Sequence, residues 1–96
     1  MKILLTGAAG QLGRQIQARN QGHAIVPLTH KDLDIANLEG VRDAVSAHRP
    51  DLILNAAAFN EVDRAEVDPD AAFRSNSLGP RNLALAAYES GAAILH

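Results

Sequence analysis

The segment LLTGAAGQLGRQ, residues 4–15, sets an apolar run directly against three glycines at three-residue spacing, Gly7, Gly10 and Gly13. A tight turn from a buried strand into a helix needs glycine where the backbone must come close to another group. A diphosphate bound at the helix N-terminus is one such group. Close packing of the strand against the helix is the other, because glycine turns also occur in α/β proteins that bind no nucleotide. The motif alone leaves both interpretations open.

Short apolar runs alternate with longer amphipathic ones along the rest of the chain. This pattern predicts strands over 2–6, 23–28, 52–54 and 92–96, and helices over 11–20, 38–48 and 69–90. Pro27 predicts that the second strand ends there or runs along an edge, and Gly79–Pro80 predicts a kink or restart in the last helix. Alternating strands and helices predict an α/β fold, a Rossmann-type doubly wound parallel sheet that is partial, with about four strands.

Length and charge exclude several classes of protein. The 96 residues suffice for one small domain or part of one, and a two-part α/β enzyme usually takes roughly 250. A net charge of −2 without a basic run argues against nucleic acid as a partner, and no run approaches the ~20 apolar residues of a membrane span. The chain has no cysteine, and its four histidines lack ligand spacing, so we expect no metal site. With no secretory signal at the start, we expect a cytoplasmic location.

Three stretches should meet at the carboxyl ends of the strands, where open parallel sheets bind ligands. They are the glycine-containing turn after the first strand (residues 7–10, called the glycine turn below), residues 29–34 and residues 55–59. Asp32 and Asp34 lie at the distance from the glycines at which an acidic residue receives ribose hydroxyls, although a solvated loop explains them equally well. Thr29, His30 and Lys31 directly follow the second strand, and a cation there could accept a 2′-phosphate. Both NADPH and NADH therefore fit as cofactor.

The third stretch, LILNAAAFNEVDRAE over residues 52–66, places three alanines after Asn55. So little side chain lets a flat ring or a ribose lie against the backbone, while Asn55 can tie neighbouring loops together. Close packing of strand on helix would also select small residues.

Five segments, TGAAGQLG, LDI, RPDLILNAAAFNEVDRAE, DAAFRSNSLGPRNLALAA and GAAILH, occur in an order and spacing that resemble the N-terminal part of the extended short-chain dehydrogenase/reductase family. The resemblance covers essentially all 96 residues and is strongest to the family's sugar-nucleotide reductases. It implies that the cofactor diphosphate is bound by Gly7, Gly10, Gln11, Leu12 and Gly13. It also implies that the adenine is flanked by Asp34 and Ile35, and that the ribose and nicotinamide side is lined by Ala57, Ala58 and Phe59. Asn76 matches an asparagine that helps to order the active site.

The resemblance also implies the reaction, hydride transfer from the nicotinamide to a 4-keto sugar nucleotide. The family's Tyr-x-x-x-Lys pair is not in this sequence, because its one tyrosine, Tyr88, is followed four positions later by Ala92. We expect Tyr88 to pack on its helix. We therefore expect residues 1–96 to be the N-terminal part of an NAD(P)-binding domain, without the catalytic strand or substrate domain, with no catalytic residue and no activity alone.

Two other functions remain open at this point. One is a non-catalytic NAD(P)-binding regulatory module, and the other is an epimerase or dehydratase that acts on a different sugar nucleotide. We also expect a homo-oligomer. We expect the fourth strand to lie beside the first, which leaves residues 92–95 at a free edge. Such an edge should lead to self-association, to exchange of segments with a second copy, or to disorder of the last residues.

Overall fold

The computed structural model describes residues 1–57 and 69–95, with side chains in the last helix described from residue 78 onward. Strands and helices alternate as the sequence predicts. Their bounds are β1 Lys2–Thr6, α1 Gln11–Ala18, β2 Ala24–Leu28, α2 Leu38–His48, β3 Leu52–Asn55, α4 Pro69–Ser90 and β4 Ala93–Leu95.

The four strands form one parallel sheet in the order β2-β1-β3-β4. Ile3 of β1 is in register with Ile25 of β2 on one side and with Leu52 of β3 on the other. The expectation that the fourth strand lies beside the first is therefore wrong. The connection from β2 passes β1 and puts β3 next to it, so β4 is one position further out, and strand order reverses between β1 and β3.

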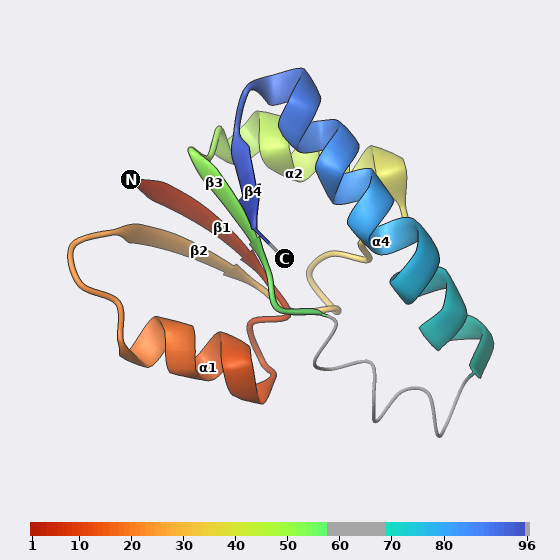
Figure 1. Cartoon of the computed structure of the whole chain (residues 1–96), viewed down its shortest axis with the longest axis horizontal. Coiled ribbons are helices and arrows are strands. Elements are labelled where there is room, and N and C mark those ends of the chain that lie inside the picture. The colour runs from red at the N-terminus through yellow and green to blue at the C-terminus, as the bar shows by residue number, and fades with distance from the viewer. Residues whose placement is uncertain (58–68, 96) are drawn as a thin grey trace.

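Helices cover the two faces of this sheet unequally (Figure 1). α2 and α4 lie on one face, where Leu4, Ile53 and Leu83 are fully buried. Of the helices that the structure describes, α1 alone lies on the other face, and its Leu12 and Ile16 pack against the cluster around Leu5. The alternation of side chains along each strand thus separates two apolar clusters.

Two helix boundaries differ from the sequence prediction. α1 ends at Ala18, two residues early, and Gly22 adopts its positive φ of 79° in the turn before β2 rather than directly after the helix. α4 is one continuous helix with Pro80 inside it, so it does not restart there. Tertiary packing offsets the missing proline N–H, because Leu83 is fully buried and Gly79 lies directly against Ile35.

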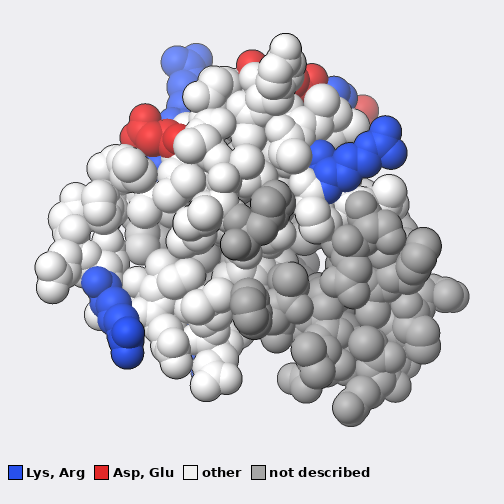
Figure 2. All heavy atoms as spheres, in the orientation of Figure 1, with Lys and Arg blue, Asp and Glu red and all other residues white. Residues whose placement is uncertain are grey.

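Most charged side chains on the face in Figure 2 stand apart, and they form no broad patch of one sign among the residues coloured there. One close pair joins the two helices of the larger layer: Nε and one terminal nitrogen of Arg42 in α2 donate to the two carboxylate oxygens of Glu89 in α4, each at 2.9 Å. Tyr88 is 86% exposed, so the expectation that it packs on its helix is wrong. Over the described ranges, no helix combines the length and apolarity that crossing a bilayer demands.

Candidate functional site

The carboxyl ends of three strands are tied together by main-chain hydrogen bonds beyond the sheet itself. Ala56 N donates to Thr6 O at 3.1 Å, which joins the end of β3 to the end of β1. Ala8 N donates to Leu28 O at 3.1 Å, which joins the turn after β1 to the end of β2. The turns at this edge therefore meet where strand order reverses, the usual place for a ligand in a sheet of this kind.

Gly7 is fixed by its conformation and by its neighbours. Its φ is +68°, and a Cβ atom there would lie 2.5 Å from Ala57 N and 2.6 Å from the carbonyl carbon of Ala56. No side chain fits against backbone at that distance. The first two alanines after Asn55 thus pack directly on the glycine turn, which is the packing explanation that the sequence left open for them.

Gly13 is equally restricted, although its backbone is helical. A Cβ atom on Gly13 would overlap Gly7 O and lie 2.8 Å from Ala8 Cα. The first turn of α1 therefore lies directly on the glycine turn, residues 7–10.

Gly10 differs from the other two glycines because its φ of −77° and ψ of 172° suit any residue. It is the N-cap of α1, and no side chain caps the helix there. Gly10 N donates to Gly7 O, and the first helical bond runs from Arg14 N to Gly10 O. Within the described part of the chain, the N–H groups of residues 11–13 have no hydrogen-bond partner.

These N–H groups suit an anion. A helix N-terminus presents unpaired donors and a partial positive charge, and the first turn of α1 carries no acidic side chain that would compete. Gly10 adds no side chain above them. The residues present therefore fit a diphosphate, because glycine leaves the approach to the donors clear.

Asn55 locks the neighbouring strand ends in place. Its Oδ1 accepts from Thr6 Oγ1 at 2.7 Å and from Ala57 N at 3.0 Å. Thr6 and Asn55 are 2% and 4% exposed. Asn55 thus ties the end of β3 to the end of β1 rather than loop to loop, and its bond to Ala57 N holds Ala57 next to the glycine turn.

The stretch after β2 consists of local turns. Asp32 Oδ2 accepts from Thr29 N at 2.9 Å and from Thr29 Oγ1 at 3.0 Å. These bonds, the backbone one foremost, lower the pKa of the Asp32 carboxyl, because they stabilise its charged form. Asp34 Oδ1 accepts from Ala36 N at 3.0 Å. Both acidic residues thus shape their own loop, while His30 and Lys31 stay exposed beside them.

Ile35 faces the interior. Its side chain is 7% exposed in the larger core cluster, and its carbonyl accepts from Asn82 Nδ2 of α4 at 2.9 Å. The adenine contacts inferred for Asp34 and Ile35 stay predictions. So do the roles of Ala58 and Phe59, which lie outside the described residues, and of Asn76, which lies in α4 without a described side chain.

Sequence reasoning missed two polar side chains that hold this edge together, Gln17 and Asn82. Gln17 Nε2 donates to Ala8 O in the glycine turn, and Asn82 secures the stretch after β2. The available signal was a polar residue among the inward positions of an amphipathic helix, next to Ile16 in one case and Leu83 in the other.

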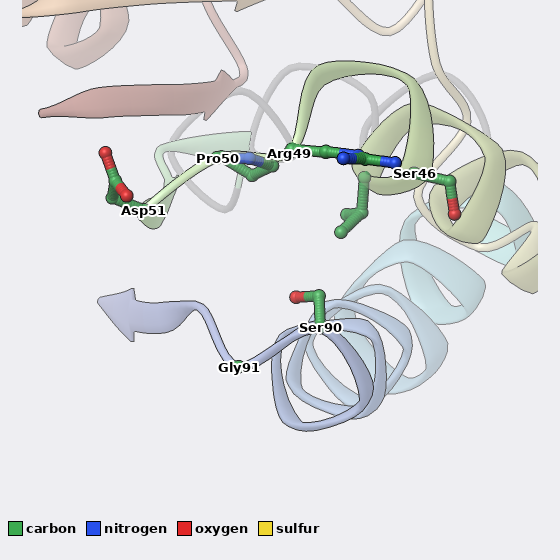
Figure 3. Close-up of a pocket in the computed structure, with 7 residues that line it drawn as sticks. Ser46, Arg49, Pro50, Asp51, Ser90 and Gly91 are labelled. Atoms are coloured by element: carbon green, nitrogen blue, oxygen red, sulfur yellow. The ribbon is translucent and has the colours of Figure 1, made fainter.

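A pocket of about 520 Å³ lies at the opposite edge, where α2 and α4 end and β3 and β4 begin. In Figure 3 the Arg49 side chain extends along it toward Ser46, with Ser90 across from it. The helix ends there present carbonyl oxygens, which disfavour an anion. Nor do three His, Asp or Glu side chains gather as a metal site anywhere in residues 1–57 and 78–95. The carboxyl edge is therefore the candidate site.

Comparison with known proteins gives one family. The pattern of the family described as "RmlD substrate binding domain" matches residues 1–96. A dTDP-4-dehydrorhamnose reductase of Streptomyces griseus is 43% identical over 94 residues, which are 96% of this chain and 31% of that protein. The chain spans about a third of the length of the curated relatives it matches.

Solved structures agree with this comparison. A dTDP-4-dehydrorhamnose reductase of Clostridium acetobutylicum is 44% identical with a TM-score of 0.85, over 98% of this chain and 34% of that one. The Bacillus anthracis enzyme in complex with NADP is 39% identical with a TM-score of 0.85, over 97% and 34%. A Thermus thermophilus UDP-glucose 4-epimerase complexed with NAD is 28% identical with a TM-score of 0.76, over 95% and 35%.

Proposed function

Since this chain belongs to the RmlD substrate binding domain family, we propose that it is the NAD(P)-binding portion of a dTDP-4-dehydrorhamnose reductase. The whole enzyme would reduce dTDP-4-dehydro-L-rhamnose to dTDP-L-rhamnose. Residues 1–96 would be the N-terminal part of its dinucleotide-binding domain. The catalytic acid and the residues that bind the sugar would then belong to other parts of the enzyme.

One observation carries the proposal: within the described residues the N–H groups of residues 11–13 have no hydrogen-bond partner, and the turn before them admits no side chain at Gly7 or Gly13. That arrangement suits the diphosphate of NADPH or NADH. Hydride supply is the chemistry that the nicotinamide brings when bound. The part of this chain is to bind and orient, with the glycine turn at the diphosphate and Ala57 on the nicotinamide side.

The turn that follows β2 would determine whether the site prefers NADPH or NADH. Asp32 already accepts two hydrogen bonds from Thr29, whereas His30 and Lys31 are exposed at the same strand end. A 2′-phosphate next to Lys31 would gain a charge-assisted contact. We expect Lys31→Ala to weaken NADPH binding about tenfold and to leave NADH binding unchanged. Equal losses for both cofactors would place the 2′-phosphate elsewhere.

Self-association and cellular location belong to the same proposal. Leu78, Leu85 and Tyr88 line the exposed side of α4, with exposed fractions of 36%, 36% and 86%. An apolar stripe of this kind supports a homo-oligomer. We place the enzyme in the cytoplasm, the compartment that supplies reduced nicotinamide cofactors.

Calorimetric titration of the purified chain with NADPH tests the proposal. We expect measurable binding, and we expect Gly10→Val to abolish it, because a branched side chain at the N-cap would stand over the donors of residues 11–13. Ala18→Val is the control, since it adds the same branched side chain at an exposed position at the other end of α1. Equal affinity in wild type and Gly10→Val would mean that the glycines only form a turn.

A second candidate, an epimerase that acts on another sugar nucleotide, is supported by the 28% identity to the UDP-glucose 4-epimerase structure. That similarity is lower than the 39–44% to the reductases, and we favour the reductase.

A further inference from the structure

We propose that Gln17 is a positioning residue that holds the glycine turn in the shape the diphosphate needs. This inference rests on the proposed function for its ligand. Gln17 lies on α1, one helical turn beyond Gly13, and its side chain is half-buried. Its Nε2 donates to Ala8 O at 2.9 Å and to Gly13 O at 3.1 Å.

The two acceptors belong to different elements. Ala8 O lies in the glycine turn, nine residues before Gln17, and Gly13 O lies in the first turn of the helix. One carboxamide therefore fastens the turn to the helix that it precedes. Of the described side chains, no other donates to a backbone carbonyl of residues 7–10.

This contact fixes the direction of a peptide group. No peptide bond in the described chain is cis, so the carbonyl of Ala8 and the N–H of Ala9 point in opposite directions. While Gln17 holds the carbonyl toward α1, the N–H of Ala9 points away from that helix. Ala9 is exposed, so no packing of its own side chain would keep this peptide from rotating.

Ala9 directly precedes Gly10, the N-cap of α1, and the unpaired N–H groups of residues 11–13 follow it. A peptide that rotates at Ala8–Ala9 would exchange the directions of the Ala8 carbonyl and the Ala9 N–H, and so change the shape of the turn that leads into Gly10. The binding shape would then be only one of several. A ligand that selects one conformer binds more weakly in proportion to that conformer's population.

The test compares Gln17→Met with Gln15→Met in the full chain. Methionine has the length and helix propensity of glutamine but no N–H donor. Gln15 lies exposed on the same helix and is the matched control. Two quantities are measured: the dissociation constant for NADPH by calorimetry, and the NMR order parameter of the Ala9 N–H in the free protein.

We expect Gln17→Met to weaken NADPH binding about three- to tenfold, the usual effect of one lost hydrogen bond. The Ala9 order parameter should fall from about 0.85, typical of rigid backbone, toward about 0.6. Gln15→Met should change neither quantity. Gln17→Asn keeps the carboxamide but shortens its reach, and we expect the same two losses, which covers the case that Gln17→Met folds poorly.

Wild-type affinity and an unchanged order parameter in both Gln17 variants would overturn the inference. A lower melting temperature with an unchanged order parameter would also overturn it, because Gln17 would then only stabilise α1. If the wild-type chain binds no dinucleotide, the proposed function fails by itself. The order parameter of Ala9 still decides whether Gln17 holds the turn.

Discussion

The turns that follow β1 and β2 lie at the same edge of the sheet but are built in different ways. At Gly7 the glycine turn is fixed by backbone from elsewhere in the chain, since Ala56 and Ala57 of the β3 end occupy the space around it. The turn after β2 is fixed by its own side chains, with Asp32 bonded to Thr29. The first turn therefore cannot accept a side chain at Gly7, whereas the second can change its charges without affecting the core.

This difference fits a division of labour at a dinucleotide site. Every such cofactor has a diphosphate, so the turn that would bind it can be rigid. Cofactors differ at the adenine ribose, which in the proposed complex would lie beside Lys31 and His30 in the locally folded turn after β2. The predictions below test the contrast between the two turns, in order of decreasing effect.

Gly7→Ala should cost the most stability, about 3 kcal/mol or more, because a positive φ and an overlap with backbone atoms add up. Gly22→Ala is the matched control: Gly22 has a similar φ of 79° and open space around it, and its replacement should cost about 1 kcal/mol. Denaturant unfolding measures both. Equal losses would show that conformation alone, without the contact to Ala56 and Ala57, explains the glycine.

Gly13→Ala should cost about 2 kcal/mol despite the higher helix propensity of alanine, because the new methyl would overlap Gly7 O. Gly40→Ala, in the first turn of α2, should have the opposite sign and stabilise by a few tenths of a kcal/mol up to about 1. The nearest atoms to a Cβ at Gly40 are the ends of the Asn37 and Leu33 side chains, at 3.4 Å. Melting temperatures that fall in both variants would contradict the contrast.

Thr6→Val and Thr29→Val remove equivalent hydroxyls from the two regions. Thr6 donates to Asn55 in a fully buried pair, and its loss should cost about 1–2 kcal/mol because Asn55 Oδ1 loses a donor without access to water. Thr29 donates to the exposed Asp32, where water replaces it, and the cost should be below about 0.5 kcal/mol. A larger loss at Thr29 would refute the assignment of the second turn as locally held and solvated.

The smallest expected effect is the change in stability at low pH that comes from Asp32. Because hydrogen bonds from Thr29 lower the pKa of the Asp32 carboxyl in the folded state, their stabilisation is present above the ordinary carboxyl pKa. It is lost as pH falls through the lowered value. NMR titration of the Asp32 carboxyl should show the lowered pKa and, in Thr29→Val, a partial return, since the backbone bond remains. A full return would mean that the hydroxyl, not the backbone N–H, is the main cause.

Local patterns in the sequence account for most of the elements. The spacing of Val41 and Val45 predicts α2 with its observed bounds, and Pro27 correctly marks β2 as an edge strand. The prediction of strand order was wrong, because β3 and β4 are both short apolar runs. Neither run contains a local signal for the strand with which it pairs. Pairing is decided by the crossover past β1, which is a property of the whole chain.

The site follows the same rule. The sequence shows that something must come close to Gly7, but the atoms that do so come from Ala56 and Ala57, some 50 residues later. Likewise, the alternation in Asp32-Leu33-Asp34-Ile35 separates exposed from buried positions, while the bond from Asn82 to Ile35 depends on where α4 packs. Contacts between distant segments depend on the tertiary structure, and they cannot be predicted from single residues in the sequence.

Gly10→Asp tests the central claim most directly, because it should move stability and binding in opposite directions. The φ of −77° at Gly10 accepts aspartate, which is a preferred N-cap and carries a charge that the helix N-terminus favours. Denaturant unfolding should therefore show stability unchanged or raised by up to about 1 kcal/mol. Calorimetry with NADPH should show binding at least about a hundredfold weaker, since the carboxylate takes the donors and repels the diphosphate. A stable Gly10→Asp chain that binds NADPH like the wild type would contradict a diphosphate site at the N-terminus of α1.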